Sequence, residues 1–223
     1  MTELPLAYCE RLSHGVEPLN TLSNLVYLLV AVWWARSGSR GSHRRFEAVS
    51  VALIGALSAL FHTWPTPGTQ ALDIAGIALF VALALYRMIA RLVARPTRRH
   101  AYATLAVASW LLASAVAATL TARAPHVLNG SLLYLPTLVA LALPIAAAGA
   151  HRRPLAAALA LFLTALALRT LDAAACTVWP YGTHTLWHLF SALTIVAVLR
   201  ALSAAQPIAL SADTAEAASR ERR

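Results

Sequence analysis

Lysine is absent from the sequence, and charged residues of every kind are scarce. All 18 basic residues are arginine, there are 9 acidic residues, and charged residues make up 12% of the 223-residue chain. A soluble domain typically carries about 25% charged residues, so this chain has too little polar surface to cover a water-soluble globule. The absence of lysine also excludes chemistry that needs a lysine amine, such as a retinal or pyridoxal Schiff base.

Hydrophobic residues, at 59% of the chain, occur in long runs separated by short polar breaks. A membrane-spanning helix needs ~20 apolar residues. We therefore predict an all-α membrane protein with seven transmembrane helices, at about 20–36, 46–64, 70–90, 101–121, 131–149, 154–174 and 184–203. Residues 1–19 would form an N-terminal segment outside the membrane, 20–203 the membrane domain, and 204–223 a disordered tail.

The arginines lie in alternate loops, which indicates how the chain crosses the membrane. Cytoplasmic loops carry an excess of basic residues, and placing the N-terminus outside puts the arginine groups at 36–45, 87–99, 152–153 and 200–223 in the cytoplasm. The outer side then has only Arg11 and Arg123. We attribute the net charge of +9 to this topology and not to nucleic-acid binding. The arginine-only composition suggests the inner membrane of a bacterium.

The polar residues inside the predicted spans fall at one level of the membrane. Ionisable residues there are costly and are functional candidates by default. Because successive spans run in opposite directions, the ends of spans two and six and the starts of spans three and seven all lie toward the outer, periplasmic face. This layer contains Ser58, His62, Gln70, Asp73, Arg169, Asp172, His184 and His188.

Three histidines in this layer have the spacing of a metal site. His184 and His188 are four residues apart, so they project from one face of a helix, one turn apart. His62 supplies a third imidazole at the same depth. Three neutral histidines with one open position form the ligand set of a catalytic zinc ion, which lowers the pKa of bound water to ~7.

Two further residues would complete this site. Ser58 lies one helical turn before His62 and could hydrogen-bond a developing oxyanion. Asp73 follows after a short loop and could carry a proton to a leaving group. Arg169 and Asp172 lie three residues apart, and we expect them to pair with each other in a structural role.

The two cysteines, Cys9 and Cys176, both fall on the predicted outer side, where disulfides persist. A bond between them would tie the N-terminal segment to the loop before the last span, over the site. We predict this disulfide.

The same histidines fit two other functions. A non-catalytic seven-helix receptor or sensor could use the metal structurally, and it would have no need for Asp73 beside an open coordination position. A haem protein could use His62 and His188 as axial ligands. A visible absorption band would distinguish haem from colourless zinc.

Five short motifs occur in order along nearly the whole chain. They are Tyr8-Cys9-Glu10 followed by E-P-L-N-T-L-S-N at 17–24, G-x-x-S-x-x-F-H at 55–62, Gln70-x-x-Asp73, Asp172-x-x-x-Cys176 and His184-x-x-Trp187-His188. Together they resemble the alkaline ceramidase family, part of a superfamily of seven-span membrane hydrolases that includes the progestin and adipoQ receptors.

This resemblance implies a hydrolase that cleaves the N-acyl amide bond of ceramide or a related membrane lipid, releasing a fatty acid and a sphingoid-type base. It implies zinc held by His62, His184 and His188, with Ser58 and Asp73 completing the site. The same site could run the reaction in reverse as an acylation. We predict no protein partner.

The resemblance also implies a calcium site in the N-terminal segment. Glu10 and Glu17 stand at ligand positions of the family, but Ala7, Tyr8 and Leu12 replace its usual aspartate, tryptophan and asparagine. Calcium prefers six to eight oxygen ligands. The remaining two glutamates therefore predict a weak calcium site.

Overall fold

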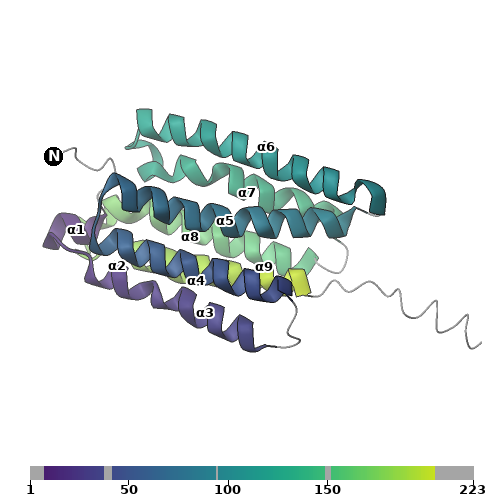
Figure 1. Cartoon of the computed structure of the whole chain (residues 1–223). Coiled ribbons are helices and arrows are strands. Elements are labelled where there is room, and N and C mark those ends of the chain that lie inside the picture. Colours follow the sequence, from purple (N-terminus) through teal and green to yellow (C-terminus); the bar gives the residue numbers. More distant parts are fainter. Residues whose placement is uncertain (1–7, 38–41, 94, 149–151, 204–223) are drawn as a thin grey trace, which may run out of the picture.

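The computed structural model describes residues 8–37, 42–93, 95–148 and 152–203, and these form a bundle of helices (Figure 1). Seven segments are long and apolar enough to cross a membrane: Pro18–Arg36, His43–Thr63, Pro67–Leu92, Pro96–Arg123, Val127–Ala146, Arg152–Ala175 and His184–Ser203. The predicted seven-span all-α fold is thereby confirmed. The predicted tail at 204–223 lies outside the described residues, and the N-out orientation stays a prediction.

The first span is divided into two helices and follows a short helix at its outer end. The described elements in chain order are α1 (Cys9–His14), α2 (Pro18–Ser23), α3 (Leu25–Arg36), α4 (Ser42–Thr63), α5 (Pro67–Leu92), α6 (Pro96–Arg123), η1 (Val127–Tyr134), α7 (Leu135–Ala142), η2 (Leu143–Ala147), α8 (Arg152–Ala175) and α9 (His184–Ser203). In Figure 1, α1 lies at the end of the bundle where α4 and α8 finish and α5 and α9 begin.

The fifth span is not one continuous α-helix. Leu128, Asn129 and Gly130 have φ values of 51°, 49° and 71° inside η1, and Pro136 and Pro144 lack the N–H that a continuing helix needs. The segment therefore consists of two 3-10 helices on either side of α7. It crosses as one span, as predicted, but it begins earlier than expected.

The helix α9 lies at the centre of the bundle and packs against α8, α3, α5 and α2. The helix α4 approaches the N-terminal helices closely at Gly55, where an added Cβ would lie 3.0 Å from both Asn24 O and Tyr27 Cβ. Small residues permit such close helix packing in membranes. This approach brings the last two turns of α4 against α2, where the site forms.

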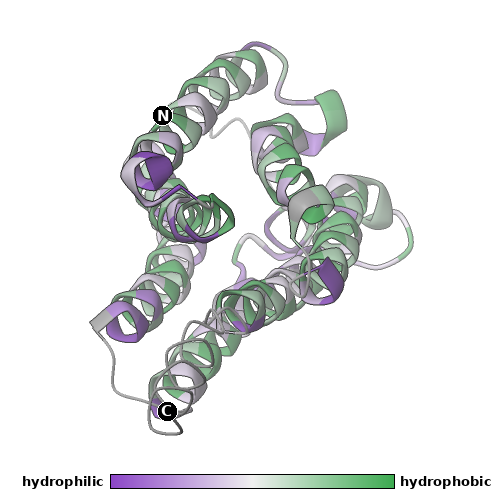
Figure 2. Cartoon of the chain, turned by 90° about the vertical axis from the view of Figure 1, so that its right-hand side faces the viewer, coloured by the Kyte–Doolittle hydropathy of each residue, from purple (hydrophilic) through white to green (hydrophobic). Residues whose placement is uncertain are grey.

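The outward surface of the bundle is apolar. Leu29, Leu112 and Leu143 are 69%, 70% and 72% exposed, and hydrophobic colouring follows the helices in Figure 2, with hydrophilic residues mainly toward their ends. An apolar face of this extent suits lipid and not water.

Candidate metal centre

Three buried histidines meet where α4 ends and α9 begins. His62, His184 and His188 are 3%, 2% and 2% exposed, and one ring nitrogen from each lies within 4.8 Å of the others. The structure therefore brings together the three residues that the spacing selected. The cluster can hold a metal ion.

Hydrogen bonds fix the orientation of two of these rings. The Nδ1 atom of His62 contacts the carboxylate of Glu17. The Ser23 hydroxyl donates its proton to Asn20 O over 2.8 Å, so at 2.6 Å it can only accept from Nδ1–H of His188. Both rings then carry their proton on Nδ1 and leave Nε2 free, which is the usual support for metal-binding histidines.

His184 is positioned by its backbone and by stacking. The Asp172 carboxylate accepts hydrogen bonds from N–H of Thr183 and His184 at 2.7 and 2.9 Å, as an acid near a helix N-terminus can. The Tyr8 ring stacks on the imidazole with 3.6 Å between centroids. Nδ1 of His184 is buried without a hydrogen-bond partner, and a bond to a metal at this nitrogen would satisfy it. The donor set fits a metal ion.

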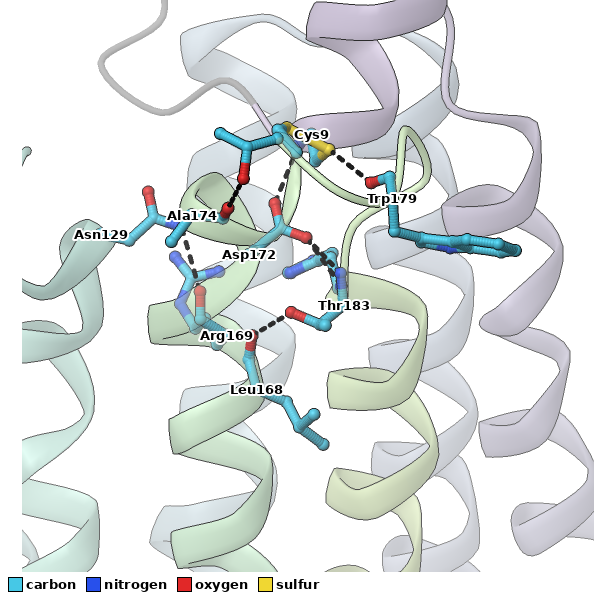
Figure 3. The surroundings of a disulfide bond; sticks show 11 residues. Cys9, Asn129, Leu168, Arg169, Asp172, Ala174, Trp179 and Thr183 are labelled. Atoms are coloured by element: carbon cyan, nitrogen blue, oxygen red, sulfur yellow. Dashed lines mark hydrogen bonds between the residues drawn. A yellow bond between two sulfur atoms is a disulfide. The ribbon is translucent and has the colours of Figure 1, made fainter.

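The predicted disulfide between Cys9 and Cys176 is confirmed, with the two Cα atoms 5.4 Å apart (Figure 3). It joins α1 to the end of α8. The N–H of Cys9 also donates to Asp172 over 2.9 Å. Gly182 has a φ of 66°, and a Cβ there would collide with Asp172 Oδ1 and Cys9 Cβ. These contacts hold the N-terminal segment against the start of α9.

The expected pairing of Arg169 with Asp172 is wrong: no ion pair joins them in the described part of the chain. Asp172 accepts from backbone N–H groups instead. The Arg169 guanidinium donates to Tyr8 Oη over 2.8 Å and lies 5.2–5.7 Å from the ring centroids of Tyr8, Tyr134 and Trp187. Aromatic faces attract a cation at such distances. Burial raises the pKa of the Tyr8 phenol.

Ser58 and Asp73 are buried beside each other on adjacent helices, at 4% and 9% exposure. The Ser58 side chain interacts with the Asp73 carboxylate across the two helices, without a hydrogen bond between them in the described residues. The Oδ1 atom of Asp73 has no hydrogen-bond partner. A buried carboxylate with one unengaged oxygen is available to accept a proton.

An apolar cavity of about 120 Å³ continues the helix faces that carry these polar residues. Three helices each carry a residue that lines the cavity one turn deeper in the bundle than a polar residue of the site. These lining residues are Ile54, one turn from Ser58, Ile77, one turn from Asp73, and Ser191, one turn from His188. Residues one turn apart share a face, so the cavity lies one helical turn deeper in the bundle than the polar cluster, whose own residues do not line it.

Glu10 and Glu17, the residues expected to bind calcium, are occupied by donors from the protein. Glu10 accepts from the backbone N–H groups of Leu19 and Asn20 at 2.8 and 2.9 Å. Glu17 forms an ion pair with Arg11 at 2.5 Å. Burial raises the pKa of the Glu17 carboxyl, and the Arg11 guanidinium opposes this effect.

Several supporting contacts could not be predicted from the sequence, although Tyr8 and Ser23 lie in the N-terminal motifs. Ser23 lies 165 residues from the histidine that it supports, and the spacing of Arg11 and Tyr8 gave no indication that they approach the site. The sequence indicated Asp172 as a polar residue of the outer layer, but it did not indicate the backbone N–H groups that Asp172 accepts from. These roles depend on contacts between distant segments.

The comparisons with known proteins concern nearly the whole chain. A family model described as Ceramidase matches residues 6–217. The match includes the three histidines, both cysteines, Ser58 and Asp73. Comparison with curated proteins gives no match.

Proposed function

Because this chain belongs to the ceramidase family, we propose that it cleaves the N-acyl amide bond of ceramide or a related lipid amide as an integral-membrane amidohydrolase. Water adds to the amide carbonyl, the C–N bond breaks, and the products are a fatty acid and an amine base. The observation that carries this proposal is the alignment of the apolar cavity with the buried histidine cluster. A lipid amide has the matching arrangement, a long apolar chain ending in a polar scissile bond.

We assign His62, His184 and His188 as ligands of a zinc ion, because three imidazoles and an open position are the catalytic ligand set of this metal. When bound, zinc would supply hydroxide at neutral pH and polarise the substrate carbonyl. The Nδ1–H groups of His62 and His188 donate to Glu17 and Ser23, which leaves each Nε2 free to bind the metal.

Asp73 and Ser58 would handle protons and charge at the scissile bond. The unengaged Oδ1 of Asp73 can accept the proton from the attacking water and deliver it to the departing nitrogen. The Ser58 hydroxyl can donate a hydrogen bond to the oxyanion that develops on the carbonyl oxygen. Both side chains are buried, so bulk water does not screen these interactions.

The cavity would hold the acyl chain between α4, α5, α7, α8 and α9. Its lining includes Ile77, Ala84 and Met88, which follow Asp73 along one face of α5. The acyl chain would come from lipid, which is as apolar as this lining, so the cavity would select the chain by shape and not by removing it from water. The head group would then face the outer side, which we propose, from the arginine distribution, to be the periplasm.

Turnover of a fluorescent long-chain ceramide by detergent-purified protein tests this proposal, with zinc quantified on the same sample. We expect release of fatty acid and one zinc ion per chain, and no visible absorption band of haem. Removal of zinc with a chelator should abolish turnover, and added zinc should restore it. Stoichiometric zinc without hydrolysis of any lipid amide would move the assignment to a receptor or sensor.

Ala84→Phe should shorten the acyl chain that the enzyme accepts. The new ring would occupy the cavity about halfway along its α5 wall. Overpacking typically costs about 1–3 kcal/mol, so kcat/KM for a long-chain substrate should fall by roughly 5- to 150-fold. A short-chain substrate should lose little. The measurement is kcat/KM over a series of acyl lengths.

Ala75→Phe is the matched control for this prediction. It makes the same substitution on the same helix, but Ala75 is exposed on the outward side of the bundle. It should leave the preference for chain length unchanged. Equal effects of both variants on all chain lengths would contradict the placement of the acyl chain.

A further inference from the structure

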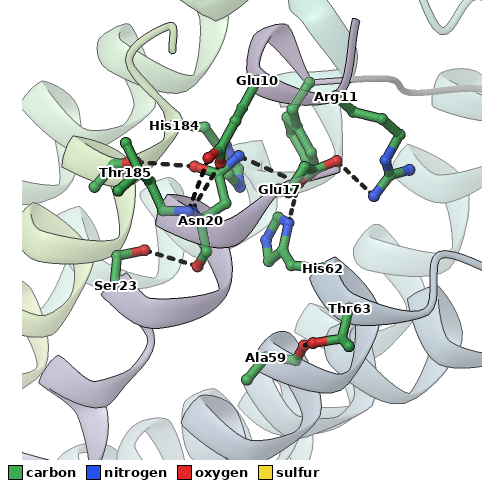
Figure 4. A network of polar contacts seen from close by, with 12 residues as sticks. Glu10, Arg11, Glu17, Asn20, Ser23, Ala59, His62, Thr63, His184 and Thr185 are labelled. Carbon is green, nitrogen blue, oxygen red and sulfur yellow. Dashed lines mark hydrogen bonds and ion pairs between the residues drawn. The ribbon is translucent and has the colours of Figure 1, made fainter. Parts of the chain in front are cut away.

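A series of polar contacts, from Arg11 to Glu17 to His62, connects the N-terminal helix to the histidine cluster (Figure 4). Arg11 of α1 lies 2.5 Å from Glu17 Oε1, with side-chain exposures of 16% and 0%. The second oxygen of Glu17 accepts from Asn20 Nδ2 at 3.2 Å and contacts Nδ1 of His62. The guanidinium of Arg11 therefore reaches a candidate metal ligand through one carboxylate.

The side-chain oxygens around these contacts are poorly arranged for binding Ca²⁺. Both oxygens of Glu10 accept backbone N–H groups, and both oxygens of Glu17 face Arg11, Asn20 or His62. Leu12 is 64% exposed and offers no side-chain oxygen. Calcium requires six to eight oxygens at 2.3–2.6 Å, and the guanidinium would repel a second cation beside Glu17. The residues present do not fit calcium.

The carboxylate of Glu17 nevertheless needs a positive partner. A fully buried carboxylate is strongly unfavourable unless it is paired and hydrogen-bonded. Arg11 supplies the only ion pair that Glu17 forms with an arginine in the described part of the chain. The guanidinium also lies 5.7 Å from the ring centroid of Phe61, the residue before His62. The position of Arg11 is thus fixed from two sides.

We propose that Arg11 is the resident cation of the N-terminal segment and a positioning residue for His62. Its guanidinium neutralises Glu17 and aims it, and Glu17 in turn holds the His62 ring with Nε2 toward the metal. The segment therefore needs no Ca²⁺. The effect on His62 rests on the proposed metal centre, whereas the absence of a calcium requirement does not.

The first experiment measures zinc affinity by chelator competition. Arg11→Gln should weaken zinc binding by roughly 10-fold, because altering the support of a metal ligand typically costs 10–100-fold. Arg11→Lys keeps the positive charge and should retain most of the affinity, and guanidinium ion should partly rescue Arg11→Gln. Arg123→Gln, at an exposed arginine on the same predicted side, is the control and should bind zinc like the wild type. Unchanged zinc affinity in Arg11→Gln would overturn the positioning role.

The second experiment tests the resident cation without using zinc or substrate. Thermal unfolding of the wild type should be the same in EGTA and in millimolar Ca²⁺. Arg11→Glu replaces the cation with a third carboxylate near Glu10 and Glu17, and its unfolding temperature should rise when Ca²⁺ is added, because ligand charge sets calcium affinity. Stabilisation of the wild type by Ca²⁺ would overturn the inference. If the protein hydrolyses no lipid amide, only the proposed function fails, since neither experiment measures turnover.

Discussion

Alanine in place of His62, His184 or His188 is expected to remove the bound metal and to lower turnover by about a thousandfold or more, equivalent to ~4 kcal/mol of lost transition-state stabilisation. The three imidazoles come from two helices and converge within 4.8 Å, so each substitution leaves only two of the three protein ligands of a catalytic zinc site. Metal content and lipid-amide hydrolysis measured on the same preparation check the result.

His126→Ala is the control for these variants. His126 is exposed at the start of the fifth span, on the same predicted side of the membrane, and its removal should change neither metal content nor turnover. Circular dichroism in detergent should show that each variant remains helical. An active, zinc-loaded His188→Ala protein would refute the proposed metal centre.

Asp73→Asn should keep the metal and lose most of the activity. The substitution preserves shape but removes the proton acceptor, and general acid–base groups typically contribute 10²–10⁴-fold to rate. Asp73 is not one of the three clustered ligands, so zinc content should stay at the wild-type level. The measurement pairs kcat with metal content.

Ser58→Ala tests whether the hydroxyl beside Asp73 stabilises the oxyanion, and it should lower kcat. It removes one hydrogen-bond donor beside Asp73, and a lost oxyanion donor typically costs 10²–10³-fold in kcat. A receptor or sensor with a structural metal would tolerate Asp73→Asn, since no proton moves in such a protein. Full activity in Asp73→Asn would remove this residue from the proposed chemistry.

Membership of the ceramidase family favours the hydrolase over the receptor and the haem protein, the two other functions that the histidines fit. The haem hypothesis required His62 and His188 on opposite sides of a porphyrin, but their ring centroids lie 5.0 Å apart, with His184 4.7 Å from His188. Three imidazoles this close suit a single small ion. The described cavity, which is apolar and adjoins the cluster, suits a lipid chain.

The sequence by itself determined the number of spans and the composition of the polar layer. A bilayer fixes the length of each apolar run and aligns the helix ends, so residues at the ends of separate spans must share a level. The four-residue spacing of His184 and His188 then selects one helix face. These inferences need only helix periodicity and membrane thickness.

The tertiary structure alone decided which groups contact the histidines. Asp172 accepts from backbone N–H groups across a turn. Arg169 lies among aromatic rings from other segments. Arg11 is linked through Glu17 to His62, which is far away in the sequence. Local spacing suggested a different partner for Arg169, because two oppositely charged residues three apart on a helix can pair. Side-chain contacts across the bundle override that local preference, since each buried polar group takes the partner that the packing of distant helices brings to it.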